Sequence, residues 1–263
     1  MIRKKDIKWA ISTFKESPYY PWEVFSKSGR KKRYDRLNRN LASQAEKKAS
    51  KIGMKIPIGW TDIDKVQMHE VLVEDPYSFP GLSPKSVVDV GAKYGEFAVT
   101  SILRGSSEAY AFEPLPSNFQ KLKELLESNN VNVRAENIAL GDSEEETEFR
   151  IDSDRIGAMI TQFGSGKKIR IKVKPLDSYN LSGIDLLKID VEGMEMHVLK
   201  GAVMTIRRNK PNIAIEVHSK SLKSEVQEFL RIEGYVQRYE SKPSKGEGKM
   251  DLLQILFFSP PIK

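Results

Sequence analysis

The sequence predicts an α/β fold in which a doubly wound, mostly parallel sheet follows a helical N-terminal extension. From Ser86 onward, apolar runs of strand length alternate with amphipathic stretches of helical length. A glycine-rich turn follows the first of these strands, and ionisable side chains end several of the others. Strands that alternate with helices form parallel sheets, which bind ligands beyond the carboxyl ends of the strands.

The individual elements follow from their local patterns. Short apolar and β-branched runs bounded by Gly, Pro or Asn predict strands at residues 85–91, 108–114, 132–140, 184–190, 212–218, 234–240 and 251–259. Helical spacing of apolar residues predicts helices at residues 94–105, 118–129, 195–209 and 224–233. Residues 145–151 and 168–176 alternate with period two and predict a hairpin or an added pair of strands. The glycine-containing stretch 153–168 is either a mobile cover over the site or a plain connection.

The first 60 residues differ from the rest in charge. They carry 16 Lys/Arg and 5 Asp/Glu, a net charge of +11 in a chain whose total is +7, and the remaining residues carry 27 and 31. We therefore expect a basic helical extension over residues 1–60 and the main domain over residues 61–263. Within residues 1–50, the basic side chains either contact an anionic partner, such as nucleic acid or a membrane surface, or form a solvated helical face.

Two helices are expected in this extension. Apolar residues recur at helical spacing over residues 7–14, and a second helix fits residues 31–50. The stretch PYYPW, residues 18–22, separates them because its two prolines resist helix formation. Before the main pattern begins, the chain has three mixed stretches, namely a strand-like one at 55–60, an alternating one at 66–74 and a Pro/Gly-rich connector at 75–84.

The turn after the first strand of the main domain, in VVDVGAKYGEFA, carries an acid and two glycines. Gly91 permits a tight turn, Gly95 lets the next helix start close to a ligand, and Asp89 can accept hydrogen bonds. A nucleotide-binding dehydrogenase has a similar outline, but here the acid precedes the first glycine and the middle glycine of G-x-G-x-x-G is absent. Glu113 ends the second strand, 24 positions after Asp89, where an acid is expected to hold ribose hydroxyls.

The strand in LLKIDVEGMEMHVLKGA, residues 186–202, ends in several ionisable groups. Strand periodicity places Lys188 and Asp190 on one face, and Glu216 and His218 share a face of the neighbouring strand. Ionisable groups that converge on one sheet edge are typical of an active site. Lys188 is either catalytic or a structural ion-pair partner of Asp190 or Glu216.

Five segments carry a resemblance to a known family. DVGAKYG, AFEPLPSNFQKL, NIALGD, LLKIDVEGMEMHVLKGA and IAIEVH occur in this order and resemble the FkbM family of S-adenosylmethionine-dependent methyltransferases. The resemblance covers the chain from about residue 70 to about residue 260 and leaves residues 1–50 outside. It implies a Rossmann-like class I methyltransferase domain, with S-adenosylmethionine bound at the carboxyl ends of the strands.

The resemblance also implies the contacts of the cofactor. Asp89, Gly91, Ala92 and Gly95 would surround its methionine part, Glu113 would hold the ribose, and Asp190 would face the place where cofactor and acceptor meet. The adenine would lie against Ile138 and Ala139, with Asn137 or Asp142 as polar contacts.

The acceptor expected from the resemblance is a hydroxyl of a saccharide or small natural product. Methyltransferases that act on base amines commonly carry Asp/Asn-Pro-Pro-aromatic where this chain has Asp190-Val-Glu-Gly193. Asp190, Glu216 or His218 could act as general base, while a divalent cation on Asp190 and Glu216 is a less favoured alternative. RNA methylation through the basic arm, or a non-catalytic cofactor-binding module, are the rival readings.

Composition limits the remaining possibilities. The chain has no cysteine, which excludes disulfides, thiolate metal sites and a cysteine nucleophile. Its opening is too polar for a signal peptide, and no apolar run approaches the ~20 residues of a membrane span. We therefore expect a cytoplasmic protein without a transmembrane segment.

Overall fold

The computed structural model of the chain describes residues 28–152, 159–161, 167–243 and 253–260. The helix predicted over residues 7–14 lies outside these residues, as does most of the stretch 153–168. Among the helices in the described ranges, none is both long and apolar enough to cross a bilayer.

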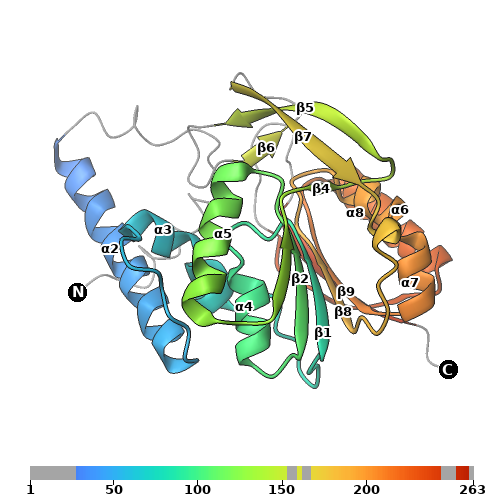
Figure 1. The fold of residues 1–263 in the computed structure, drawn as a ribbon, viewed down its shortest axis with the longest axis horizontal. Coiled ribbons are helices and arrows are strands. Elements are labelled where there is room, and N and C mark those ends of the chain that lie inside the picture. The colour runs from blue at the N-terminus through green and yellow to red at the C-terminus, as the bar shows by residue number, and fades with distance from the viewer. Residues whose placement is uncertain (1–27, 153–158, 162–166, 244–252, 261–263) are drawn as a thin grey trace.

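A seven-stranded sheet forms the centre of the molecule (Figure 1), in the order β3-β2-β1-β8-β9-β11-β10. The strands are β1 (Ser86–Val90), β2 (Glu108–Phe112), β3 (Val133–Glu136), β8 (Leu186–Ile189), β9 (Asn212–Val217), β10 (Val236–Glu240) and β11 (Gln254–Ser259). All neighbours pair in parallel except β11, which runs antiparallel to both β9 and β10. The strand order reverses between β1 and β8, and ligands bind at such a switch point.

Helices cover both faces of this sheet (Figure 1). On one face lie α4 (Glu96–Leu103) and α5 (Pro116–Asn129), and on the other lie α6 (Glu195–Lys200), α7 (Val203–Asn209) and α8 (Lys220–Ile232). Alternate residues of the strands pack on opposite sides: Val88 and Leu187 join the core under α6–α8, whereas Val87 and Leu186 join the core under α4 and α5. The predicted doubly wound α/β fold is therefore confirmed.

The single helix predicted over residues 195–209 is wrong, because the structure has two short helices, α6 and α7. At the break, Gly201 approaches Gly141 so closely that a Cβ on Gly201 would collide with the carbonyl oxygen of Gly141. The new helix start is then capped by Asp177, whose carboxylate accepts hydrogen bonds from the backbone N–H groups of Met204 (2.9 Å) and Thr205 (2.7 Å).

A second, four-stranded sheet lies at the top of the view in Figure 1, in the order β4-β7-β5-β6. It consists of β4 (Ala139–Leu140), β5 (Glu145–Asp152), β6 (Met159–Thr161) and β7 (Lys167–Lys174). The antiparallel pairing of β5 with β7 confirms the predicted added strands. The single strand predicted over 132–140 is wrong, because β3 pairs with β2 in the central sheet and β4 pairs with β7 in the second one.

The segment before β1 is helical. It forms α2 (Ser28–Lys51), α3 (Asp62–Gln67) and a π-helical turn, η1 (Glu70–Glu74). The strand-like stretch 55–60 forms no strand, and the alternating stretch 66–74 lies mostly in α3 and η1. Helix α3 starts at a capping box in which Thr61 and Asp64 exchange side-chain-to-backbone hydrogen bonds, and this local signal outweighs the alternating pattern.

The described part of the extension packs on the main domain. Ala45 and Ala49 of α2 are buried in one cluster with Trp60, Val99 of α4 and Leu125 of α5. Figure 1 shows α2 on the outer side of the molecule, away from α6–α8. Helix α2 thus covers part of the domain, and the boundary at residue 60 stays a prediction.

Candidate active site

The glycine turn brings the end of β1 against the end of β8. Gly91 has φ +76°, and its N–H donates to the carbonyl of Phe112 at 3.0 Å. A Cβ at this position would collide with the backbone carbonyl of Asp190, so glycine is needed for the close approach of the two strand ends. At Gly95, a Cβ would lie 3.0 Å from Leu122 Cγ, so that glycine serves the packing of α4 on α5.

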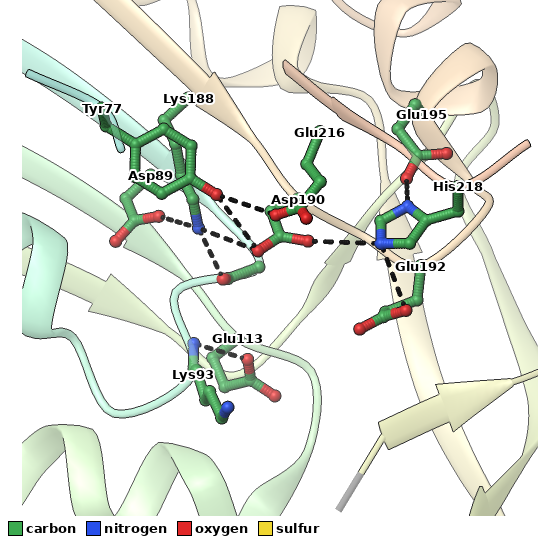
Figure 2. Close-up of polar contacts among 11 residues, drawn as sticks. Tyr77, Asp89, Lys93, Glu113, Lys188, Asp190, Glu192, Glu195, Glu216 and His218 are labelled. Atoms are coloured by element: carbon green, nitrogen blue, oxygen red, sulfur yellow. Dashed lines mark hydrogen bonds and ion pairs between the residues drawn. The ribbon is translucent and has the colours of Figure 1, made fainter. Parts of the chain in front are cut away.

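Lys188 forms a buried ion pair across the two central strands. It is the register partner of Asp89, and its Nζ lies 2.9 Å from Asp89 Oδ1 and donates to Gly91 O at 3.0 Å (Figure 2). Burial would lower the pKa of Lys188, but the carboxylates of Asp89 and Asp190 outweigh it and raise that pKa above its ordinary value. The ion-pair reading is confirmed, but the short contact is with Asp89, whereas Asp190 Oδ2 lies 4.0 Å away.

The Glu113 carboxylate fastens the glycine turn to the segment after β2. Its Oε2 accepts from the backbone N–H of Lys93 at 2.8 Å (Figure 2). Its Oε1 accepts from the N–H of Leu115 at 2.9 Å. Burial raises the pKa of Glu113 to about 7, against the opposing effect of these N–H donors. The role predicted for Glu113 toward ribose hydroxyls stays a prediction.

A tyrosine from the connector before β1 joins two carboxylates at the strand ends. The Tyr77 hydroxyl donates toward Glu216 Oε2 at 3.2 Å and toward Asp190 Oδ2 at 3.4 Å (Figure 2). Burial and the charges of these two carboxylates raise the pKa of Tyr77 well above 10, so its hydroxyl stays protonated and acts as donor. The Asp190 side chain is 29% exposed, whereas Glu216 is buried.

His218 lies on the other side of Asp190. Its Nδ1 is 2.7 Å from Glu195 Oε1, while its Nε2 is 3.3 Å from Glu192 Oε2 and 3.9 Å from Asp190 Oδ1 (Figure 2). Burial would lower the pKa of His218, but the carboxylates of Glu192, Glu195 and Glu216 outweigh it and raise that pKa well above 6.5. The predicted convergence of ionisable groups on one sheet edge is thus found in the structure.

The residues predicted around the adenine lie near the end of β3 and in β4. The Asn137 amide donates to the carbonyls of Glu113 (2.8 Å) and Pro114 (3.0 Å). Ile138 is buried in the core under α6–α8, and Ala139 belongs to β4.

Two further residues predicted near the cofactor are Ala92 and Asp142. Ala92 is buried and donates through its N–H to Phe112 O at 3.0 Å, and Asp142 Oδ1 lies 3.1 Å from His197 Nδ1. No contact among these residues tests their predicted roles.

Sequence reasoning missed three residues of this region. Tyr77 comes from a connector in which nothing marked it, and Glu195 lies within the quoted strand-end segment but was not singled out. Glu96 directly follows Gly95 at the start of α4, where a carboxylate is favoured by the helix dipole. Its Oε2 is buried without a hydrogen-bond partner among the described residues, and burial raises the pKa of Glu96 to about 7.

The strand order, the single antiparallel strand and the glycine turn define the class I methyltransferase fold. The family described as "Methyltransferase FkbM domain" matches residues 89–242, more than half of the chain, and the protein therefore belongs to the FkbM methyltransferase family. This confirms the resemblance read from the five sequence segments.

Individual relatives are distant. "Methyltransferase 1" of Beauveria bassiana is 26% identical over an alignment of 160 residues, and the match covers 50% of this chain and 64% of that protein. The FkbM methyltransferase of Methylobacillus flagellatus superposes with a TM-score of 0.49 at 18% identity, over 85% of this chain and 60% of that one. The ribosomal protein L11 methylase of Lactobacillus delbrueckii gives 0.46 at 9% identity, over 75% and 80%. The match thus covers less than two thirds of the length of the Beauveria and Methylobacillus proteins.

The family and the fold imply S-adenosylmethionine as the methyl donor, a ligand with a positive sulfonium and a positive ammonium group. The described strand ends suit such a ligand, because the carboxylates of Asp190, Glu192 and Glu216 outnumber the cationic side chains there. Glu96 adds a buried carboxylate oxygen without a partner beside the glycine turn. The residues present therefore fit the donor.

Proposed function

We propose that the protein is an S-adenosylmethionine-dependent O-methyltransferase acting on a hydroxyl of a saccharide or small natural product in the cytoplasm. The observation that supports this most is the position of Asp190. Its partly exposed carboxylate stands at the end of β8, directly beside the glycine turn, and is flanked by the Tyr77 hydroxyl and by His218. A partly exposed carboxylate with one oxygen held by a hydroxyl donor is suited to receive a proton from a hydroxyl group.

In this mechanism the bound donor supplies an activated methyl group, and the chain supplies orientation and a proton acceptor. Tyr77 donates toward Asp190 Oδ2 and so fixes the plane of the carboxylate, which leaves Oδ1 for the acceptor hydroxyl. As the methyl group is transferred, the hydroxyl proton passes to Asp190. Lys188 balances the buried charge of Asp89, and it acts on the reaction only by keeping the two strand ends together.

Two further roles follow from burial. Glu216 is buried and accepts from Tyr77, so it positions that hydroxyl and does not reach the acceptor. His218, whose pKa is raised by the neighbouring carboxylates, offsets the charges of Asp190 and Glu192 when its ring is protonated. Among the three predicted bases, Asp190 is therefore the one we assign.

The test combines binding with transfer. Isothermal titration with S-adenosylmethionine comes first, followed by transfer of a labelled methyl group to glycan, small-molecule, lipid and RNA fractions. Asp190→Asn should lower the transfer rate at saturating donor at least ~100-fold, the scale of general-base catalysis, while the donor Kd rises only by the effect of losing one carboxylate. Glu127→Gln, which alters an exposed carboxylate on α5, should leave both unchanged. Undiminished transfer by Asp190→Asn would show that the base is another group.

RNA methylation is the second candidate. It is supported by the net charge of +11 in residues 1–60, which suits contact of residues 1–50 with phosphates. Transfer to RNA in preference to the other fractions, with binding that weakens steeply as salt rises, would replace the O-methylation proposal. Donor binding without transfer to any fraction would instead favour a non-catalytic cofactor-binding module.

A further inference from the structure

Three ligand-type side chains, one of them the proposed base Asp190, converge at the strand ends. Asp190 and Glu192 follow β8, His218 follows β9, and one ligand atom from each lies within 4.8 Å of the other two. His218 Nε2 is 3.3 Å from Glu192 Oε2 and 3.9 Å from Asp190 Oδ1. Two ligand atoms that bind one divalent ion at right angles are about 3 Å apart, so these separations need only a small adjustment to become a coordination sphere.

The orientation of His218 is fixed from behind. The ring is almost fully buried, and its Nδ1 lies 2.7 Å from Oε1 of Glu195, whose side chain has no exposed surface. The N–H of Gly193 donates to the same oxygen at 3.0 Å, so this carboxylate is held in place. Because Glu195 accepts at Nδ1, the lone pair of a neutral ring lies on Nε2 and is directed toward Asp190 and Glu192. A carboxylate that holds the far nitrogen in this way typically accompanies a metal-binding histidine.

Asp190 is oriented in a comparable manner. Its Oδ2 receives the Tyr77 hydroxyl and faces Lys188 Nζ at 4.0 Å, while its Oδ1 is the atom nearest His218 Nε2. A neutral Nε2 lone pair that faces two carboxylates is electrostatically unfavourable unless a positive charge lies among the three groups. That charge is either a second proton on the imidazole or a cation.

The geometry points to a divalent cation site formed by Asp190, Glu192 and His218, with Glu195 as the positioning residue behind the histidine. Two carboxylates and one imidazole suit a cation such as Mn²⁺, which accepts both oxygen and nitrogen ligands. Three protein ligands leave coordination positions open. The role we assign to these positions, binding the acceptor hydroxyl and making it more acidic, rests on the proposed methyl transfer to a hydroxyl group. Binding of the cation itself does not depend on that proposal.

The experiment measures binding of Mn²⁺ to the full-length, metal-stripped protein by titration calorimetry and by the electron paramagnetic resonance signal of free Mn²⁺. Wild type should bind one Mn²⁺ ion per chain, and added Mg²⁺ should compete with it for the site. His218→Gln and Glu192→Gln should each weaken binding at least tenfold, and Glu195→Gln should weaken it about 10- to 100-fold through loss of the ring orientation. His197→Gln is the matched control, since it changes an exposed histidine paired with a carboxylate, and it should bind as wild type does.

Near-ultraviolet circular dichroism checks that each variant is folded. Glu192 is partly exposed on a loop, so Glu192→Gln tests the site even where His218→Gln does not fold. The inference is overturned if wild type binds no Mn²⁺, or if Glu192→Gln binds Mn²⁺ as tightly as wild type does. In either case the cluster is not a cation site, and its charges are balanced by a protonated His218 instead. Donor binding and methyl transfer are assayed separately. Transfer without Mn²⁺ binding would overturn only the cation site, and Mn²⁺ binding without transfer would overturn only the proposed function.

Discussion

Asp89 and Lys188 face each other on the two central strands, and Nζ of the lysine lies 2.9 Å from Oδ1 of the aspartate with neither side chain more than 5% exposed. The same ammonium group donates to the carbonyl of Gly91 in the turn. The pair therefore connects the sheet interior to the turn that borders the proposed cofactor site. Because both charges are removed from water, each depends on the other.

Breaking this pair should be costly. Lys188→Met leaves the Asp89 carboxylate buried without its cation, and loss of one partner of a buried pair costs about 3–5 kcal/mol. Asp89→Asn should have a smaller effect, because Asp190 lies 4.0 Å from Lys188 Nζ and retains part of the attraction. In urea unfolding, the double variant should lose less free energy of unfolding than the two single variants lose together. Strictly additive losses would mean that the two groups do not interact energetically.

Gly91→Ala should disrupt the turn. The residue would adopt a left-handed conformation at φ +76°, and its new methyl group would meet the carbonyl of Asp190. Gly105→Ala is the control, since Gly105 also has a positive φ of +107° but nothing within 4 Å of an added Cβ. In the control, backbone strain should lower the free energy of unfolding by ~1–2 kcal/mol. Gly91→Ala should lower it clearly more and should also lose donor binding. Equal urea midpoints for the two variants would contradict the close approach.

The stability of the ligand-free protein should depend on the ionisation of Glu96. Burial raises its folded-state pKa from 4.5 to about 7, so the folded protein holds this proton more tightly than the unfolded chain. That contribution is complete below pH ~4.5 and is lost as the pH rises through about 7. Glu96→Gln keeps a neutral side chain at every pH. It should match wild type near pH 5 and exceed its stability near pH 8 by up to ~3 kcal/mol.

Thermal or urea unfolding across this pH range measures the difference. Glu127→Gln, at an exposed carboxylate on α5, is the control and should follow the wild-type profile. A Glu96→Gln profile parallel to that of wild type would mean that Glu96 has the same proton affinity in both states.

Tyr77→Phe should distinguish the contribution of the Tyr77 hydroxyl from that of its ring. The ring packs edge-on against Phe97 at 5.5 Å between centroids, and phenylalanine keeps this contact. Loss of the hydrogen bonds to Asp190 and Glu216 should lower the methyl-transfer rate about tenfold, the effect of ~1.4 kcal/mol, with little change in donor affinity. Tyr179→Phe removes a hydroxyl that donates to Glu136 at 2.6 Å and should leave the rate unchanged. Equal rates for Tyr77→Phe and wild type would remove Tyr77 from the positioning of Asp190.

The central sheet could be predicted because its signal is local. Each strand is a short apolar run, and parallel strands place their carboxyl ends at one edge, which is why Lys188, Asp190, Glu216 and His218 were expected together. Asp190 was expected as an ion-pair partner of Lys188 and lies 4.0 Å away, but the closer partner, Asp89, was missed for the complementary reason. Asp190 is close to Lys188 in sequence, and Glu216 lies on the strand that was expected to neighbour it. The contact with Asp89 depends instead on β1 and β8 being neighbours.

Features that depend on tertiary packing could not be predicted. Tyr77 reaches the site only because its connector folds back over the sheet and packs on Phe97. The break between α6 and α7 follows from the contact of Gly201 with Gly141, two residues from separate parts of the chain. Glu195 became recognisable as a support for His218 only once the ring orientation was known.

The family match over residues 89–242 is shorter than the structural unit that forms the site. Tyr77 precedes it, and β11, whose Ile255 is the register partner of Glu216, follows it. A fragment trimmed to the matched segment would lose three of the five residues of β1 and would leave the edge of β9 without its antiparallel neighbour. Shortened versions of this protein should therefore retain at least residues 77–259 to remain both foldable and active.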